Sequence, residues 1–359
     1  MAMIGGLDVH RAQITYDWVD SCSGEARRGQ VEPAHRVAVR KWLAGLPCAG
    51  GDFAVEGCTG WRYVVEELER AGYVAHVAEP AETAARRGPK RRAKTDRADA
   101  KHQRELLEDG RLPESWIPPG HILDLREVTR LRKTLADIRG EWQQRIHALL
   151  FHHGLPRPER GLLHADTRAW LIRPDLLPAA GRALLWAGYA QIDGACAQLV
   201  PLDRWIAAYA RVQPGCRELI ARHWGVGEVT GVTILAELGD ARRFRNGDAA
   251  VRYTGLDVTV HSSDGKRSAG HLAKQGPEAL RWALYEAAKN HSRAGAPHHA
   301  LYRDVKRRLG GKRATLTVAR KLARELRHTL IDLGDAALAP VDADRLPPLP
   351  ALQAPAAAA

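Results

Sequence analysis

The chain has 359 residues and a formal net charge of +12, and its composition is 45% hydrophobic and 27% charged. These values are typical of a globular protein and exclude a fibrous or disordered chain, and the length is enough for two domains. The excess of lysine and arginine indicates a polyanionic partner, because basic side chains that bind nucleic acid release its condensed counterions.

No export signal or metal-binding cysteine pattern is recognisable. The amino terminus lacks a basic leader followed by an apolar run, and no window approaches 18 uninterrupted apolar residues. We therefore expect a cytoplasmic, nucleoid-associated prokaryotic protein with no membrane partner. The cysteines form no CxxC pair, so neither a zinc site nor a disulfide framework is expected of Cys22, Cys48, Cys58, Cys196 and Cys216.

The first hundred residues alternate between strand and helix patterns. Short apolar or alternating runs predict strands, and periods of three and four predict helices. Three strands followed by helix–strand alternation predict an α/β fold with a mixed sheet. The expected strands are 3–9, 13–19, 25–31, 52–56 and 73–77, and the expected helices are 35–46, 61–71 and 96–107.

A basic run precedes the last of these helices. Residues 86–101 hold eight lysines and arginines against two aspartates. Such a run is typical of a solvated loop, and a nucleic-acid partner would make it a phosphate-binding segment. The residues that we expect to contact nucleic acid here are Arg91, Arg92, Lys94 and Arg97.

The clearest helix of the chain covers residues 122–150, where apolar residues recur at steps of three and four. Its narrow apolar stripe fits packing within the chain or pairing with a second chain, and we favour a dimer element. Shorter helices, interrupted at proline and glycine, are expected over residues 154–215, and a second domain over residues 216–334. The Ala/Pro-rich tail, residues 335–359, is expected to be disordered.

Four acids mark one candidate site. Asp8 and Glu56 each end an apolar strand, and Asp96 and Asp99 lie three residues apart at a helix start. Such positions can meet at one edge of a sheet, where carboxylates could hold two Mg²⁺ ions for phosphodiester cleavage. Each acid also has a structural interpretation, for example Asp96 as a helix cap.

The second domain contains a candidate nucleophile loop. Ser262 and Ser263 lie in a polar turn followed by Lys266 and Arg267, where a serine could attack phosphorus beside cations. The same pattern fits a basic-flanked hairpin with no catalytic role. Upstream, the turn Trp224–Gly227 opens a helix, which fits either a helix-hairpin-helix phosphate contact or an ordinary tight turn.

Three motifs resemble the DEDD signature of the insertion-sequence-110 (IS110) family of transposases. They are GLDVH with Asp8, AVEGCTG with Glu56, and KTDRADAK with Asp96 and Asp99. The resemblance implies an RNase H-like, RuvC-type catalytic domain with the RNase H strand order. It also implies that these four acids hold Mg²⁺, with two ions expected. A further implication is a structured guide RNA, called the bridge RNA.

The carboxyl-terminal half resembles the same family's transposase domain through Gly255-Leu256, the serine loop, GHLAKQG and Leu280-Arg281. The resemblance implies an essential serine in the loop. We favour Ser263 and keep Ser262 beside it. Lys274 and Arg281, with Lys266 and Arg267, are the nucleic-acid contacts expected in this half.

The sequence thus predicts three parts and a tail. These are a RuvC-like domain over residues 1–115, a helical linker and dimer element over 116–215, and a mainly helical transposase domain over 216–334. The function expected is a Mg²⁺-dependent DNA transposase or recombinase with a serine nucleophile, acting on donor and target DNA as a homodimer or tetramer. A Holliday-junction-type endonuclease and a non-catalytic nucleic-acid-binding protein are the alternatives.

Overall fold

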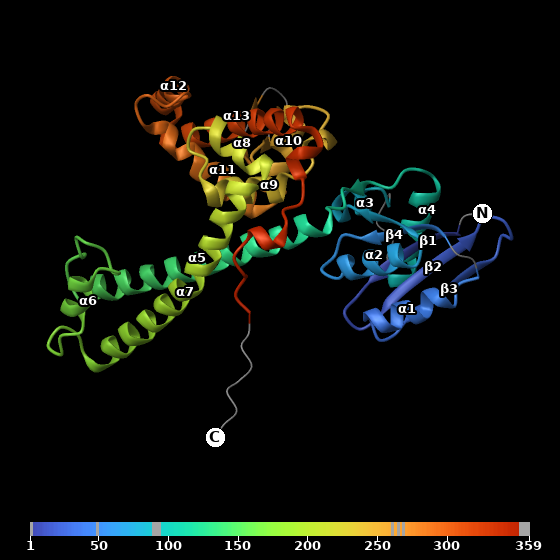
Figure 1. Ribbon diagram of the computed structural model, residues 1–359, viewed down its shortest axis with the longest axis horizontal. Helices are drawn as coiled ribbons and strands as arrows, with labels where there is room; N and C mark the ends of the chain where they lie inside the picture. The colour runs from blue at the N-terminus through green and yellow to red at the C-terminus, as the bar shows by residue number, and fades with distance from the viewer. Residues whose placement is uncertain are drawn as a thin grey trace. The chain divides into compact units, whose positions relative to one another are not determined.

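The computed structural model describes residues 3–47, 50–87, 95–259, 262–263, 266–267 and 270–351. It divides into two compact units, Met1–Ile117 and Pro118–Ala359, drawn in Figure 1. The division falls close to the end of the first domain predicted from the sequence.

The first unit is built on a six-stranded mixed sheet of order β3-β2-β1-β4-β5-β6. Strands β1 to β3 form an antiparallel meander, β4 and β5 run parallel to β1, and β6 is antiparallel to β5. This is the RNase H-type order, so the predicted fold class is confirmed. The strands are Met3–Val9, Ile14–Asp20, Ala26–Val31, Gly51–Glu56, Val74–Ala78 and Glu114–Ser115.

Helices cover both faces of this sheet. Helices α1 and α2 lie on one face, where Trp42 packs against the rings of Tyr16 and Phe53, and they enclose a core that includes Leu7 and Leu68. Helix α4 packs on β1, β2 and β4. The helices of the first unit are α1 (Arg36–Ala44), α2 (Trp61–Arg70), α3 (Pro80–Ala85) and α4 (Asp96–Glu108).

Two features hold α4 close to the sheet. A Cβ on Gly6 would lie 2.1 Å from the carbonyl oxygen of Ala100, so only glycine allows this approach. Beside it, the buried Asp17 carboxylate accepts from Nε of Arg104 at 2.5 Å and from Nε of Arg28 at 2.5 Å. Because Gly6 and Asp17 are register partners, both contacts lie on the same sheet face.

The second unit begins with a long helical hairpin. Helix α5 (Gly120–His152) confirms the predicted long helix, and it packs along α7 (Ala179–Val212) of the same chain. Ile146 and Leu150 meet Leu185 and Ile192 in one apolar cluster. Most of the apolar stripe that favoured a dimer element is therefore used within the chain, while Leu131 is exposed, and the oligomeric state stays a prediction.

The expectation of only short helices between residues 154 and 215 was wrong. Helix α7 runs for 34 residues and continues through Pro201. Glycine within it is used for packing, because a Cβ on Gly188 would lie 3.1 Å from Ile146. Close packing on α5 compensates for the proline and glycines that suggested breaks.

The remainder of the second unit is mainly helical, as predicted. Helix α9 is joined to α5 by the buried Glu237, whose carboxylate accepts from Arg130 at 2.6 and 2.9 Å. The elements are α6 (Ala165–Leu171), α8 (Pro214–Arg222), α9 (Glu228–Leu238), α10 (Gly247–Thr254), β7 (Val258–Thr259), β8 (Ser262–Ser263), β9 (Lys266–Arg267), β10 (His271–Leu272), α11 (Glu278–Lys289), α12 (His299–Leu309) and α13 (Gly311–Asp332), with 3-10 turns at Ala241–Arg243 and Asn290–Ser292.

The tail differs from the predicted disorder over its first part. Gly334–Leu338 and Ala343–Arg345 form 3-10 helices, and Ala337 is buried. The amide of the buried Gln213 donates to the Ala337 carbonyl at 2.8 Å, which ties this segment to α8. Within the described part of the chain, none of the helices is long and apolar enough to cross a membrane.

Candidate active site

Two of the predicted acids lie side by side at the carboxyl end of the sheet. Strands β1 and β4 are parallel, and Leu7 is paired with Val55, so Asp8 and Glu56 occupy the next position on each strand. Side chains alternate along a strand, which places both acids on the face that carries Gly6. Helix α4 covers that face. Asp8 is buried and Glu56 is half-buried.

The other two acids start helix α4. Thr95 caps the helix by accepting from the Ala98 amide at 3.2 Å, and Asp96 and Asp99 occupy the first turn. Carboxylates are favoured there because the helix amino terminus carries partial positive charge. Asp96 is half-exposed and accepts from the side-chain amide of Gln13 at 3.3 Å.

Asp99 faces a cation from the chain itself. It is buried, and one of its carboxylate oxygens lies 2.6 Å from Nη1 of Arg87. Arg87 belongs to the basic run, whose residues Arg91, Arg92 and Lys94 lie outside the described residues. Arg97, the fourth nucleic-acid contact predicted in this run, is described by the structure, and its side chain is exposed.

The four acids form one electrostatic neighbourhood. The pKa of Asp8 is raised from 3.8 to about 6, mainly by burial and also by the negative charges of Asp96, Asp99 and Glu56, while His10 acts in the opposite direction. A buried carboxylate surrounded by like charge is destabilised in its ionised form unless a cation neutralises it. The arrangement is therefore suited to a divalent cation.

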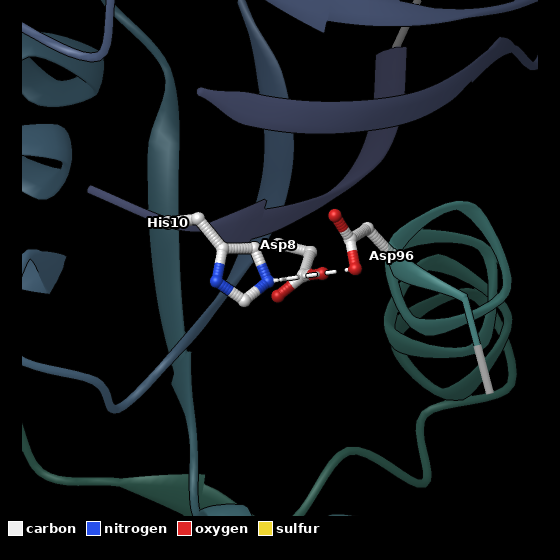
Figure 2. Close-up of side chains that lie close together, drawn as sticks. All are labelled: Asp8, His10 and Asp96. Carbon is white, nitrogen blue, oxygen red and sulfur yellow. Dashed lines mark hydrogen bonds and ion pairs between the residues drawn. The ribbon is translucent and has the colours of Figure 1, made fainter. Parts of the chain in front are cut away.

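Sequence reasoning missed His10. Its Nε2 lies 3.2 Å from Oδ2 of Asp8 and 3.6 Å from Oδ1 of Asp96, and Figure 2 shows the ring facing both carboxylates. Among the described residues, Asp8, His10 and Asp96 offer three ligand atoms within 4.8 Å of one another. The signal was present in GLDVH, because the second residue after a strand-end acid returns to the same face. These donors fit a divalent metal ion.

A cavity of about 570 Å³ opens beside this cluster. His10 lines it together with Arg11, Cys58, Thr59 and Tyr63. Basic, hydroxyl and aromatic groups around one cavity are suited to a nucleotide, since they can contact phosphate and stack on a base. The volume is within the range of ligand pockets in proteins.

The predicted serines lie on a small hairpin of the second unit. Strand β8 (Ser262–Ser263) pairs with β9 (Lys266–Arg267), with Ser262 opposite Arg267 and Ser263 opposite Lys266. The side chains of these four residues are outside what the structure describes. The register brings both serines next to basic positions of the neighbouring strand.

The base of the hairpin is fixed by arginines from two helices. Arg320 of α13 donates to the Leu256 carbonyl at 2.6 Å, and Arg281 of α11 donates to the Gly276 carbonyl at 2.7 Å. Arg281 is thus committed to the backbone here, and its contact with nucleic acid stays a prediction. Lys274 is exposed and has a positive φ of 55°.

An RNase H-type sheet with acids gathered at its carboxyl end, followed by a helical domain, fits an enzyme that acts on phosphodiester bonds. Comparison with known proteins makes the assignment narrower. An IS110-type DEDD family model, described as a transposase, matches residues 6–153. A second model, described as "Transposase IS116/IS110/IS902 family", matches residues 217–303. The chain belongs to the IS110 family of transposases.

Individual relatives agree with this assignment. The chain is 27% identical over 293 residues to the "Probable family 20 transposase" of Pseudomonas aeruginosa, which covers 79% of this chain and 82% of the relative. It is 22% identical over 258 residues to the "Transposase for insertion sequence element IS1328" of Yersinia enterocolitica, with 71% and 74% covered. Both likenesses extend over most of each chain.

Proposed function

We propose that this transposase cleaves and rejoins DNA with a Mg²⁺-dependent acidic site formed by Asp8, Glu56, Asp96 and Asp99. The observation that supports it most is the meeting of Asp8 and Asp96 around one histidine nitrogen, with the charges of Asp99 and Glu56 acting on the same buried carboxylate. Like charge collected at the end of a sheet is costly unless it binds a cation.

Each acid has a distinct part in this proposal. Asp8 and Asp96 would hold the cation, Glu56 would complete the carboxylate set from the neighbouring strand, and Asp99 would exchange Arg87 for metal or water. A bound Mg²⁺ pair supplies charge neutralisation for the attacking and leaving oxygens of a phosphodiester. The cavity lined by Thr59 and Tyr63 would bind the nucleotide that adjoins the scissile phosphate.

The serine hairpin would supply the covalent step. The Oγ of Ser263, with Ser262 as the alternative, would attack phosphorus as the bond between phosphorus and the leaving deoxyribose oxygen breaks. The hydroxyl proton passes to a base, and the leaving oxygen takes up a proton. Rejoining is the same exchange with a new deoxyribose hydroxyl, so the number of phosphodiester bonds is conserved. Lysine and arginine opposite the serines favour the charge that develops.

Strand cleavage tests the acidic site. With Mg²⁺ and element-end DNA, Asp8→Asn should lower the cleavage rate by about 10³-fold, because loss of metal stabilisation costs several kcal/mol. Asp52→Asn is the matched control, since Asp52 lies on the same strand and face as Glu56 at the other end of β4. Equal activity of Asp8→Asn and wild type would contradict the proposal.

We further propose a structured guide RNA and action as a homodimer or tetramer on nucleoid DNA. The formal charge of +12 and the basic run of residues 86–101 support a nucleic-acid partner.

Sequencing the RNA that copurifies with the chain should show one structured transcript from the element's flank. Mixing Asp8→Asn subunits with Ser263→Ala subunits tests whether one active site takes its acids and its serine from two different chains. Activity should return in the mixture only if it does, because a site formed within one chain would lack either the acid or the serine.

A further inference from the structure

The imidazole of His10 is placed differently from that of another acid-paired histidine in the same unit. His76 contacts Asp52 with Nε2 at 3.0 Å and Glu114 with Nδ1 at 3.2 Å. Its two acids therefore lie on opposite sides of the ring and cannot share one ion through it. His10 instead turns the single atom Nε2 toward both Asp8 and Asp96.

The separations around His10 match those of ligand atoms on one cation. Neighbouring ligands of an octahedral ion at about 2.1 Å lie about 3 Å apart. The Nε2 of His10 is 3.2 Å from an oxygen of Asp8 and 3.6 Å from an oxygen of Asp96. All three ligand atoms lie within 4.8 Å of one another, and Asp96 is the more exposed of the two carboxylates.

Access from solvent also favours this role. The side chain of Asp8 is 4% exposed, whereas that of His10 is 54% exposed and lines the 570 Å³ cavity. Of the two groups, the imidazole is therefore the one that an ion arriving from solvent can reach first.

We propose that Nε2 of His10 is a ligand of the cation held by Asp8 and Asp96, and that it shifts the preference of this site from Mg²⁺ toward first-row transition ions. The inference rests on the proposed function, in which these acids bind a divalent cation. Imidazole nitrogen suits transition ions, whereas Mg²⁺ takes oxygen ligands and water. The nitrogen should strengthen Co²⁺ binding more than Mn²⁺ binding, following the order of divalent-ion affinities.

Metal titration of the full chain tests this directly, with the metal ions alone as probes. Isothermal titration should show that His10→Asn weakens Co²⁺ binding by about 100-fold, Mn²⁺ by about 10-fold and Mg²⁺ by less than about 3-fold, in the order of the affinities of these ions for a nitrogen ligand. His76→Asn is the matched control and should leave all three affinities unchanged. Because His10 is exposed, its variant should melt at the wild-type temperature.

Pulsed electron paramagnetic resonance of bound Mn²⁺ gives an independent readout. Wild-type and His76→Asn protein should show nitrogen coupling to the ion, and His10→Asn should lose it. Nitrogen coupling that persists in His10→Asn, or equal weakening of all three metals, would overturn the assignment of His10. If Asp8→Asn abolishes binding while His10→Asn changes nothing, the inference fails and the acidic site stands. Absence of binding in the wild type would refute both.

Discussion

The acidic corner of the first unit and the serine hairpin of the second are built in opposite ways. Glu56 is the last residue of a six-residue strand and Asp8 the last but one of a seven-residue strand, both in the middle of a sheet and beneath a helix held by Gly6 and Asp17. The serines lie on a two-residue strand paired with another two-residue strand. Scaffold changes should therefore damage the acidic site through folding, whereas changes in the hairpin should alter chemistry alone.

The largest expected effect is the loss of strand rejoining when the serine of the hairpin is replaced. Ser263→Ala should lower strand rejoining by about 10³-fold or more, as expected for loss of a nucleophile worth several kcal/mol. Its melting temperature should stay within about 2 °C of wild type, because a single hydroxyl is removed from a two-residue strand. If Ser262→Ala lost strand rejoining and Ser263→Ala kept it, the nucleophile would be Ser262. Full activity of both variants would leave a hydrolytic, resolvase-like enzyme.

The next largest effect is expected on the free energy of unfolding, from the ion pair between Asp17 and Arg104 that holds α4 on the sheet. Arg104 and Arg28 both pair with the buried Asp17 at 2.5 Å, but their side chains are 8% and 56% exposed. Arg104→Ala should lower the free energy of unfolding by about 3 kcal/mol, since it leaves a buried charge poorly compensated. Arg28→Ala should cost less than about 1 kcal/mol. Urea denaturation measures both, and equal losses would contradict a buried anchor.

The smallest expected effect is a dependence of stability on pH. Burial and then neighbouring acids raise the pKa of Asp8 from 3.8 to about 6, so the folded state favours the protonated acid. In metal-free protein this contribution is present below about pH 4 and is lost as the pH rises through 6. Asp8→Asn should therefore stabilise the chelator-treated protein at pH 7.5 by up to about 3 kcal/mol, with little difference at pH 4. A variant less stable than wild type at pH 7.5 would contradict burial of the charge.

Local patterns in the sequence were enough to predict five of the six strands of the sheet and the acids at strand ends, whereas the two-residue strand β6 was not predicted. Alternation and strand-end acids located Asp8 and Glu56, because parallel neighbouring strands end at the same edge. The contacts that refine the site depend on tertiary packing. Nothing in the spacing indicates that Arg87 faces Asp99 or that Arg104 reaches Asp17, 87 residues away along the chain.

Tertiary packing explains the remaining differences between the sequence prediction and the structure. Pro201 and several glycines suggested breaks where α7 is continuous, because packing on α5 outweighs local propensity. The tail composition suggested disorder, yet Gln213 binds its backbone. Both cases depend on partners distant in sequence.

The most direct test of the acidic site is a crystal structure of the chain soaked with Mn²⁺ and measured at the manganese absorption edge. We predict an anomalous peak within about 2.3 Å of Asp8 and Asp96 oxygens, typical of a first-row ion bound by carboxylate. Peaks elsewhere on the chain, with Asp8 and Asp96 still bound only to protein or water, would contradict the account.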